Sequence, residues 1–391
     1  MRFLTAGESH GRGVLALLEG IPAGLSVSVE QINALLERRQ KGYGRGPRMA
    51  LEKDRVTVLS GIRGSKTTGA PITLWVDNND WENKQGLMQP FGPLQGEPIR
   101  RPRPGHADLA GAMKYGTYDI RDVFERASAR ETAARCAAGG LVLILLSELG
   151  ISVAGFVTAL GGVTADIPDV SLTEIVRLRD ASAVMCPDEN ASRRMMEEID
   201  RAKADGDTLG GVFEVRALGV PPGLGSYVQW DRRLDGLLAH AVMSIQGIKA
   251  VEIGAGVRSS AMRGSLCHDA IVRATSGWLP YRRASNNAGG LEAGVTNGET
   301  LVVRGHMKPI ATTRRGLPSV DLDTGEACVS HYERSDVCAV PAASVVGEAA
   351  VALVIAQAVL DKFAKDSMRE LKHSFRHYLE CVRDFGKRDE R

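Results

Sequence analysis

Apolar residues recur at helical spacing in several parts of this chain. A capping box of Ser28 and Gln31 predicts the start of a helix that ends near Gln40. Its apolar face comprises Ile32, Leu35 and Leu36. A longer helix is predicted over residues 130–149, because its second half is apolar on all sides and Gly150 then ends it. A third helix follows from the spacing of Leu234, Leu237, Leu238, Ala241, Val242 and Ile245. Ser171 and Glu174 form a second capping box, which predicts another short helix.

Short segments rich in Val and Ile predict strands between these helices. They lie near residues 55–60, 70–76, 151–158, 211–218, 249–253 and 300–306. The mixture predicts a mixed α and β protein, and the long apolar helices indicate a layer covered on two sides, as in a sheet–helix–sheet sandwich. Helix-then-strand units recur at 129–149 into 151–158 and at 233–247 into 249–253, which indicates an internal duplication.

Composition limits the possibilities further. The chain has 391 residues, of which 43% are hydrophobic and 25% charged, and no linker-like tract divides it. We therefore expect one domain over residues 1–391, with a core of about 1–362 and a helical tail of about 363–391. A net charge of +2 argues against a basic nucleic-acid binder.

No targeting or membrane segment is predicted. The N-terminus lacks the apolar region of a signal peptide, and the apolar run from Cys136 to Leu146 is too short to span a bilayer. Residues 341–360 are long enough, but Glu348 and Gln357 interrupt them, so a buried helix is the better interpretation. Six cysteines without a C-x-x-C spacing favour reduced structural thiols over a zinc site. We expect a cytoplasmic protein that binds no metal.

Arginines cluster beside glycine-rich loops. Arg38, Arg39, Arg45 and Arg48 surround one helix end, Arg100, Arg101 and Arg103 precede His106, Arg126 and Arg130 flank Ser128, and Arg334 precedes Asp336. Guanidinium groups bind carboxylate and phosphate through paired hydrogen bonds, so these clusters favour a small polyanionic ligand. A solvated surface is the alternative for any single arginine. RNA binding is the alternative for Arg100 to Arg103, but no aromatic residues for base stacking are interleaved there.

Two histidines lie among Gly, Ser and Arg rather than on apolar faces. They are His10 in Gly7-Glu8-Ser9-His10-Gly11 and His106 in Arg103-Pro104-Gly105-His106-Ala107-Asp108. Histidine is the natural proton donor near neutral pH, although a lone histidine is more often structural. Ser128 is predicted to cap the 130–149 helix, with Glu131 completing a capping box, and a helix N-terminus between Arg126 and Arg130 also suits an anion.

Taken together, these segments resemble the chorismate synthase family. Besides the two histidine motifs, matching segments are 126–132, 243–249, 287–298, 308–310 and 334–336, in family order over nearly the whole chain. The resemblance implies a single α+β sandwich, with helices between two antiparallel sheets, assembled as a homotetramer. It also implies anti-1,4-elimination of phosphate from 5-enolpyruvylshikimate 3-phosphate to give chorismate, with reduced FMN required although nothing is oxidised overall.

The resemblance also implies roles for individual residues. His10 would protonate the leaving phosphate, His106 would lie near flavin N1, and Asp336 would deprotonate flavin N5, with Ser9 and Ser128 supporting this proton relay. The substrate-binding candidates are Arg39, Arg45, Arg48, Arg103, Arg130 and Arg334. The FMN-contact candidates are Arg126, Ala127, Ser128, Gln246, Gly247, Ala293, Lys308, Pro309, Ile310, Ala311, Thr312 and Arg334. Of these, Gly247, Ala293 and Ala311 depart from the commoner family residues. Arg39 and Arg45 are also linked in the family with NADPH as a reductant.

Two other functions compete with this interpretation. An ordinary flavin oxidoreductase would consume NAD(P)H in step with product. A non-catalytic RNA-binding protein would bind in a salt-sensitive manner and would not need His10 or His106.

Overall fold

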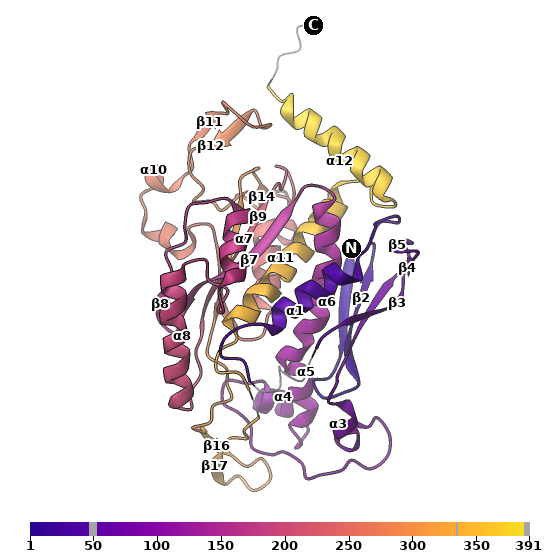
Figure 1. The fold of residues 1–391 in the computed structure, drawn as a ribbon, viewed down its shortest axis with the longest axis vertical. Helices are drawn as coiled ribbons and strands as arrows, with labels where there is room; N and C mark the ends of the chain where they lie inside the picture. Colours follow the sequence, from indigo (N-terminus) through magenta and orange to yellow (C-terminus); the bar gives the residue numbers. More distant parts are fainter. Residues whose placement is uncertain (47–52, 334, 387–391) are drawn as a thin grey trace.

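The computed structural model describes residues 1–46, 53–333 and 335–386, and two antiparallel sheets form its framework (Figure 1). The first sheet has the strand order β1 (Arg2–Gly7), β2 (Gly13–Glu19), β6 (Ile72–Asp77), β3 (Val56–Ser60). The second has the order β10 (Ile248–Ile253), β15 (Leu301–Met307), β9 (Gly211–Leu218), β7 (Ser152–Leu160), β8 (Val163–Thr164). Alternate residues of β6 are buried, as expected for a sheet with one face on the core.

Helices lie between the two sheets. The helix α6 (Thr132–Ser147) packs on β2 and β6 of the first sheet, whereas α11 (Val340–Lys362) packs on β7 and β9 of the second. The two helices also pack against each other, and α1 (Val29–Gln40) lies against both. Figure 1 shows this helical layer through the middle of the molecule. The layer needs apolar residues all round because both of its faces are covered.

The remaining elements are shorter or lie outside these layers. The other helices are α3 (Trp81–Met88), α4 (Asp108–Tyr115), α5 (Arg121–Ala127), α7 (Leu172–Ala181), α8 (Glu189–Ala204), α9 (Leu234–Met243), α10 (Gly264–Cys267) and α12 (Met368–Arg383). Small hairpins pair β4 (Ile62–Arg63) with β5 (Lys66–Thr67), β11 (Ile271–Arg273) with β12 (Tyr281–Arg283), β13 (Leu291–Glu292) with β14 (Val295–Thr296), and β16 (Pro318–Val320) with β17 (Ala327–Val329). Turns of 3-10 helix are η1 (Ala129–Glu131), η2 (Trp230–Arg232) and η3 (Gly256–Ala261).

Most of the predicted elements are present. The three long helices appear as α1, α6 and α9, and Ser28 and Ser171 each accept a hydrogen bond at a helix start. All six predicted strands are found within two residues of their expected starts. The strands β1 and β2 and the helix α8 were not predicted. The α+β class is confirmed, and the internal duplication stays a prediction.

The predicted capping box at Ser128 is wrong in its detail. Ser128 Oγ accepts from the backbone N–H of Arg130 at 3.2 Å, and the turn η1 then precedes α6. The side chain of Glu131 turns instead to Thr5 Oγ1 at 2.7 Å and to Arg135 Nε at 2.9 Å. Because its carboxylate is directed to Thr5 on β1 and to Arg135, Glu131 does not accept from the backbone N–H of Ser128 as a capping box requires.

The helix α11 is the element that a hydropathy profile would single out. It is long and apolar enough to cross a membrane, yet 89% of its apolar 18-residue stretch is buried inside the protein. Within it, Glu348 is buried and accepts hydrogen bonds from Arg38 on α1 and from the backbone N–H of Gly155 on β7. The predicted buried helix is therefore confirmed, and its buried acid, Glu348, is paired within the core.

The C-terminal helix α12 ties the ends of both sheets together. The backbone N–H of Met368 donates to Ala23 O at 2.9 Å, next to the first sheet, and Tyr378 Oη donates to Pro222 O at 2.9 Å, next to the second. Phe363 packs edge-on against Phe375 and Tyr378, with ring centroids 5.1 and 5.5 Å apart. The tail thus closes one end of the helical layer with apolar contacts.

The contact between α6 and α11 depends on a residue without a side chain. A Cβ added to Gly139 would lie 2.4 Å from Ala349 Cβ, so Gly139→Ala forces the two helices apart. We expect this overpacking to lower the free energy of unfolding by about 1–3 kcal/mol in denaturant titrations. The control is Gly236→Ala in α9, where the new Cβ meets nothing within 4 Å. An unchanged midpoint for Gly139→Ala would contradict the packing described here.

Candidate active site

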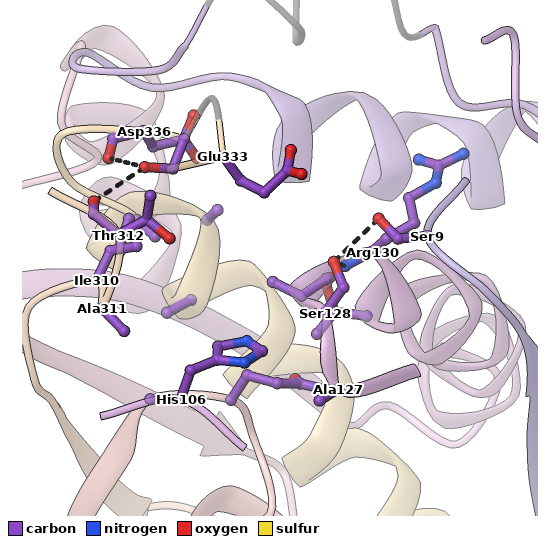
Figure 2. Close-up of a pocket in the computed structure, with 18 of the residues that line it drawn as sticks. Ser9, His106, Ala127, Ser128, Arg130, Ile310, Ala311, Thr312, Glu333 and Asp336 are labelled. Carbon is purple, nitrogen blue, oxygen red and sulfur yellow. Dashed lines mark hydrogen bonds between the residues drawn. The ribbon is translucent and has the colours of Figure 1, made fainter. Parts of the chain in front are cut away.

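A cavity of about 400 Å³ lies where the N-terminus of α6 meets four loops. Most predicted site residues line it, although they come from segments far apart in the chain. They are Ser9, His10, Arg39, Arg45, Arg103, His106, Ala127, Ser128, Arg130, Gln246, Gly247, Lys308, Pro309, Ile310, Ala311, Thr312 and Asp336. Figure 2 shows Ser9, Ser128 and Arg130 on one side of this cavity and Thr312, Glu333 and Asp336 on the other. Its volume suits small-molecule ligands.

His10 lies on the connection between β1 and β2, and a buried carboxylate holds it there. Its Nδ1 is 2.7 Å from Glu125 Oε1, and its backbone N–H donates to Glu125 Oε2 at 2.7 Å. The backbone N–H of Ser9 donates to Glu125 O at 2.9 Å. Glu125 on α5 thereby fixes both the loop and the imidazole ring.

His106 is held in a second carboxylate pair. Its Nδ1 is 2.5 Å from Asp108 Oδ1, and Arg103 binds the same carboxylate through Nε at 2.7 Å and Nη2 at 3.0 Å. Burial alone would raise the pKa of Asp108, but hydrogen bonds from His106 and Arg103 hold that pKa well below its ordinary value. Asp108 therefore stays charged and orients the imidazole.

Two of the predicted substrate-binding arginines share one buried acid. Asp54 accepts from Arg39 Nη2 at 2.6 Å and from Arg130 Nη1 at 2.5 Å. Burial would raise the pKa of Asp54, but the charges of Arg39 and Arg130 lower it overall. All three side chains are buried, so the acid allows two cations to lie close together in a site with little water.

Asn78 links this arginine pair to the histidine loop. Its Oδ1 accepts from Arg130 Nε at 2.8 Å. Its Nδ2 donates to the backbone oxygens of Glu8, Ser9 and Gly11 at 3.2, 3.0 and 2.6 Å. The position of His10 is thus coupled to that of Arg130, which lines the cavity.

Asp336 closes the opposite side of the cavity. Its Oδ2 pairs with Arg45 Nη1 at 2.8 Å, and its Oδ1 accepts from the backbone N–H of Gly46 at 2.6 Å. Nearby, Lys308 Nζ donates to Gly105 O at 2.6 Å. Burial, with repulsion from Lys249, lowers the pKa of Lys308. Loops from four regions of the chain are thereby joined around one space.

Ser9 and Ser128 are in direct contact, with Ser128 Oγ donating to Ser9 Oγ at 3.1 Å (Figure 2). Both belong to segments anchored by buried acids. On the same side, Gln246 Nε2 donates to Glu131 Oε2 at 3.1 Å, and Gln246 Oε1 is buried without a hydrogen-bond partner among the described residues. This acceptor is therefore available to a hydrogen-bond donor in the cavity.

Four predicted residues are not brought to the cavity by the described structure. Arg126 donates to Thr5 O at 2.9 Å at the end of β1, and Ala293 lies at the β13–β14 turn with φ of 49°. Within the described residues 1–46, 53–333 and 335–386, neither Arg126 nor Ala293 lines the cavity. Arg48 and Arg334 lie outside the described residues. Their assignments stay predictions.

Several acids and amides that organise the site were not predicted from the sequence. Asp108 and Glu125 stood within recognised motifs, and their proximity to His106 and to Arg126 was the available signal. Asp54 and Asn78 carried no signal, because each lies far in sequence from the arginine that it holds. Glu333, which also lines the cavity, was not predicted, because a single acid in a polar loop carries no distinctive local pattern.

Comparison with known proteins identifies the family. A family model described as chorismate synthase matches residues 1–360. Chorismate synthases of Desulforudis audaxviator and Desulforamulus reducens are 56% and 53% identical, over 98% of this chain and 98% and 99% of theirs. A crystal structure of chorismate synthase superposes with a TM-score of 0.80 at 42% identity, covering 98% of each chain. The chain therefore belongs to the chorismate synthase family, lyases of the shikimate pathway.

Proposed function

We propose that this protein converts 5-enolpyruvylshikimate 3-phosphate to chorismate by anti-1,4-elimination of phosphate, with reduced FMN bound. The main support for this proposal is that one cavity brings together arginines from three segments with His10 and His106. An anion-binding wall beside two oriented imidazoles suits a reaction that releases phosphate. The reaction breaks the carbon–oxygen bond to phosphate and removes one proton from the substrate ring.

The arginines supply the charge that this substrate needs. It carries two carboxylates and a phosphate, about three to four negative charges near neutral pH. Arg39, Arg45, Arg103 and Arg130 all line the cavity, and each is already oriented by a carboxylate. Oriented guanidinium groups lose little conformational freedom on binding, which favours affinity for a rigid polyanion.

The residues present fit reduced FMN. Ala127, Ile245, Met307, Pro309 and Ile310 give part of the lining an apolar character suited to a flat ring system. Gln246 Oε1 offers an unpaired acceptor for a ring N–H, and Gly247, at a φ of 84°, exposes its backbone there. When bound, the reduced flavin lends electron density to the allylic system of the substrate as phosphate departs.

The protein's own residues would handle the protons. His10 donates a proton to the departing phosphate, because an unprotonated phosphate is a poorer leaving group. His106, whose ring Asp108 orients, would lie near flavin N1 and control the protonation state of the reduced ring. Asp336 is the proposed proton acceptor, and Arg45 and the Gly46 amide orient its carboxylate. Ser9 and Ser128 support this arrangement through their mutual hydrogen bond.

An anaerobic assay tests the proposal. The protein is mixed with 5-enolpyruvylshikimate 3-phosphate and a catalytic amount of chemically reduced FMN, and phosphate release and chorismate absorbance are followed. We expect many phosphates per flavin, with no net oxidation. A flavin oxidoreductase would instead consume one reductant per product. Folded protein that releases no phosphate would refute the proposal.

The family resemblance is the main support for the proposed assembly and the sole support for the proposed reductant. We propose a single domain over residues 1–391, assembled as a cytoplasmic homotetramer, with NADPH as the candidate reductant near Arg39 and Arg45. Tyr227, Val228 and Trp230 are 74%, 79% and 79% exposed, which is apolar surface that an assembly would cover. Sedimentation equilibrium distinguishes a tetramer from a monomer.

A further inference from the structure

The side-chain amide of Gln246 has a fixed direction in the cavity wall. Its Nε2 donates to Glu131 Oε2 at 3.1 Å, and a carboxylate can only accept hydrogen bonds. The donor end of the amide therefore faces Glu131, and the acceptor end, Oε1, faces the other way. Oε1 is buried and accepts no hydrogen bond from residues 1–46, 53–333 and 335–386. Buried polar atoms are nearly always paired, and Gln246 lines the cavity, so a bound ligand can supply the donor.

The acid that holds this amide is itself buried and charged. Burial would raise the pKa of Glu131, but the charge of Arg135 and the hydrogen bonds that Glu131 accepts lower it overall. Thr5 Oγ1 on β1 donates to its Oε1 at 2.7 Å, and Arg135 Nε donates to both of its oxygens, at 3.0 and 2.9 Å. Arg135 Nη1 also donates to Ser244 Oγ at 2.7 Å, so the same arginine joins the acid to the loop that carries Gln246. Glu131 thus stays an acceptor near neutral pH and keeps its position.

We propose that Glu131 is the positioning residue for Gln246: it fixes the amide so that Oε1 accepts a hydrogen bond from a ring N–H of bound FMN. This inference rests on the proposed function, which places the flavin in this cavity. The flavin ring carries an N–H at N3 in either redox state and gains one at N5 on reduction. A glutamine in place of Glu131 can donate as well as accept, so the Gln246 amide could turn round and present Nε2 to the ring. An N–H that faces another N–H makes no hydrogen bond, and the affinity for the flavin then falls.

A double-mutant cycle distinguishes this role from a purely structural one. In Glu131→Gln, which keeps the shape of the side chain, the Kd for chemically reduced FMN should rise roughly 3–10-fold, as expected for the loss of one hydrogen bond. Gln246→Ala should raise this Kd at least as much. Adding Glu131→Gln to Gln246→Ala should change nothing further, because the amide through which Glu131 acts is gone. Anaerobic calorimetric titration measures each Kd. An unchanged Kd in Glu131→Gln, or effects that multiply in the double variant, would overturn the inference.

The matched control is Glu214→Gln on β9. Glu214 is also buried and also pairs with arginine, with Arg216 Nε at 2.6 Å and Arg304 Nε at 2.7 Å, away from the cavity lining. This variant should leave the Kd for reduced FMN unchanged even if it lowers stability. An equal rise of Kd in the control would show that the loss of any buried carboxylate loosens the flavin site, which contradicts the specific role of Glu131.

Proton–nitrogen NMR of glutamine-labelled protein reports on the amide without flavin. With the Gln246 signals assigned by their loss in Gln246→Ala, one of its two side-chain amide protons should be shifted downfield by the carboxylate, and this shift should vanish in Glu131→Gln. A Gln246 amide without such a proton in the folded wild type would overturn the inference even if Glu131→Gln misfolded. Wild-type protein that shows the shifted proton but binds no reduced FMN would instead refute the proposed function, and the flavin contact with it.

Discussion

Replacing His10 by alanine should lower kcat about 100- to 10,000-fold, the usual contribution of a well-placed general acid. The cause is loss of the proton that neutralises the departing phosphate. KM should change only a few-fold, because the buried arginines Arg39, Arg103 and Arg130 carry the attraction for the anion. The measurement is steady-state phosphate release under anaerobic conditions with excess reduced FMN.

The control for this experiment is His373→Ala on the exposed face of α12, which should keep the wild-type rate. Substrate binding is measured separately, by calorimetry with oxidised FMN. If His10→Ala weakens binding as much as turnover, His10 contributes to anion binding rather than to proton transfer. A wild-type kcat would remove His10 from the mechanism altogether.

Removing Asp54 should cause the largest loss of stability among the site residues. In Asp54→Ala the guanidinium groups of Arg39 and Arg130 lose their shared partner in a buried site, at a cost of about 3–5 kcal/mol in the free energy of unfolding. Denaturant unfolding followed by circular dichroism measures this loss. Asp323→Ala is the control, because the exposed pair of Asp323 with Arg100 should contribute at most about 1 kcal/mol.

The effect of Asp54 should also depend on pH. Its pKa is lower in the folded protein than its ordinary value of 3.8, so its stabilising contribution is complete above that value and disappears as the pH falls through the folded pKa. The stability difference between wild type and Asp54→Ala should therefore shrink below about pH 4. A difference that stays constant into strong acid would show that Asp54 acts by packing rather than by charge.

Local signals in the sequence were sufficient for most elements of the fold. Capping residues, apolar spacing and Val-rich segments located α1, α6, α9 and the central strands, because these features act over neighbouring residues. The strands β1 and β2 were not predicted, because Gly7-Glu8-Ser9-His10-Gly11 has the residue types of a chemical motif and also forms the connection of a hairpin. The register that pairs Gly7 with Val14 explains why that motif is compact.

The catalytic candidates were predicted through motifs, whereas their partners were not. His10 and His106 stood out by residue type and neighbours. The pairing of Asp54 with Arg130, or of Asn78 with the carbonyl of Ser9, joins residues that are many positions apart. Such contacts are set by how α6 docks on the first sheet, and no local pattern encodes that docking. Ser128 shows the same limit, since its cap was foreseen but the turn η1 was not.

The two ends of the helical layer are closed by different kinds of contact. At the α12 end the aromatic rings of Phe363, Phe375 and Tyr378 join the sheets, whereas loops held by charged pairs close the other end (Figure 1). Hydrogen exchange should therefore show an order of loosening. Acid protonates carboxylates and leaves aromatic packing intact. At low pH the amides of residues 7–11 should therefore exchange before those of α12, so that the loop end of the helical layer opens first while the α12 end stays closed.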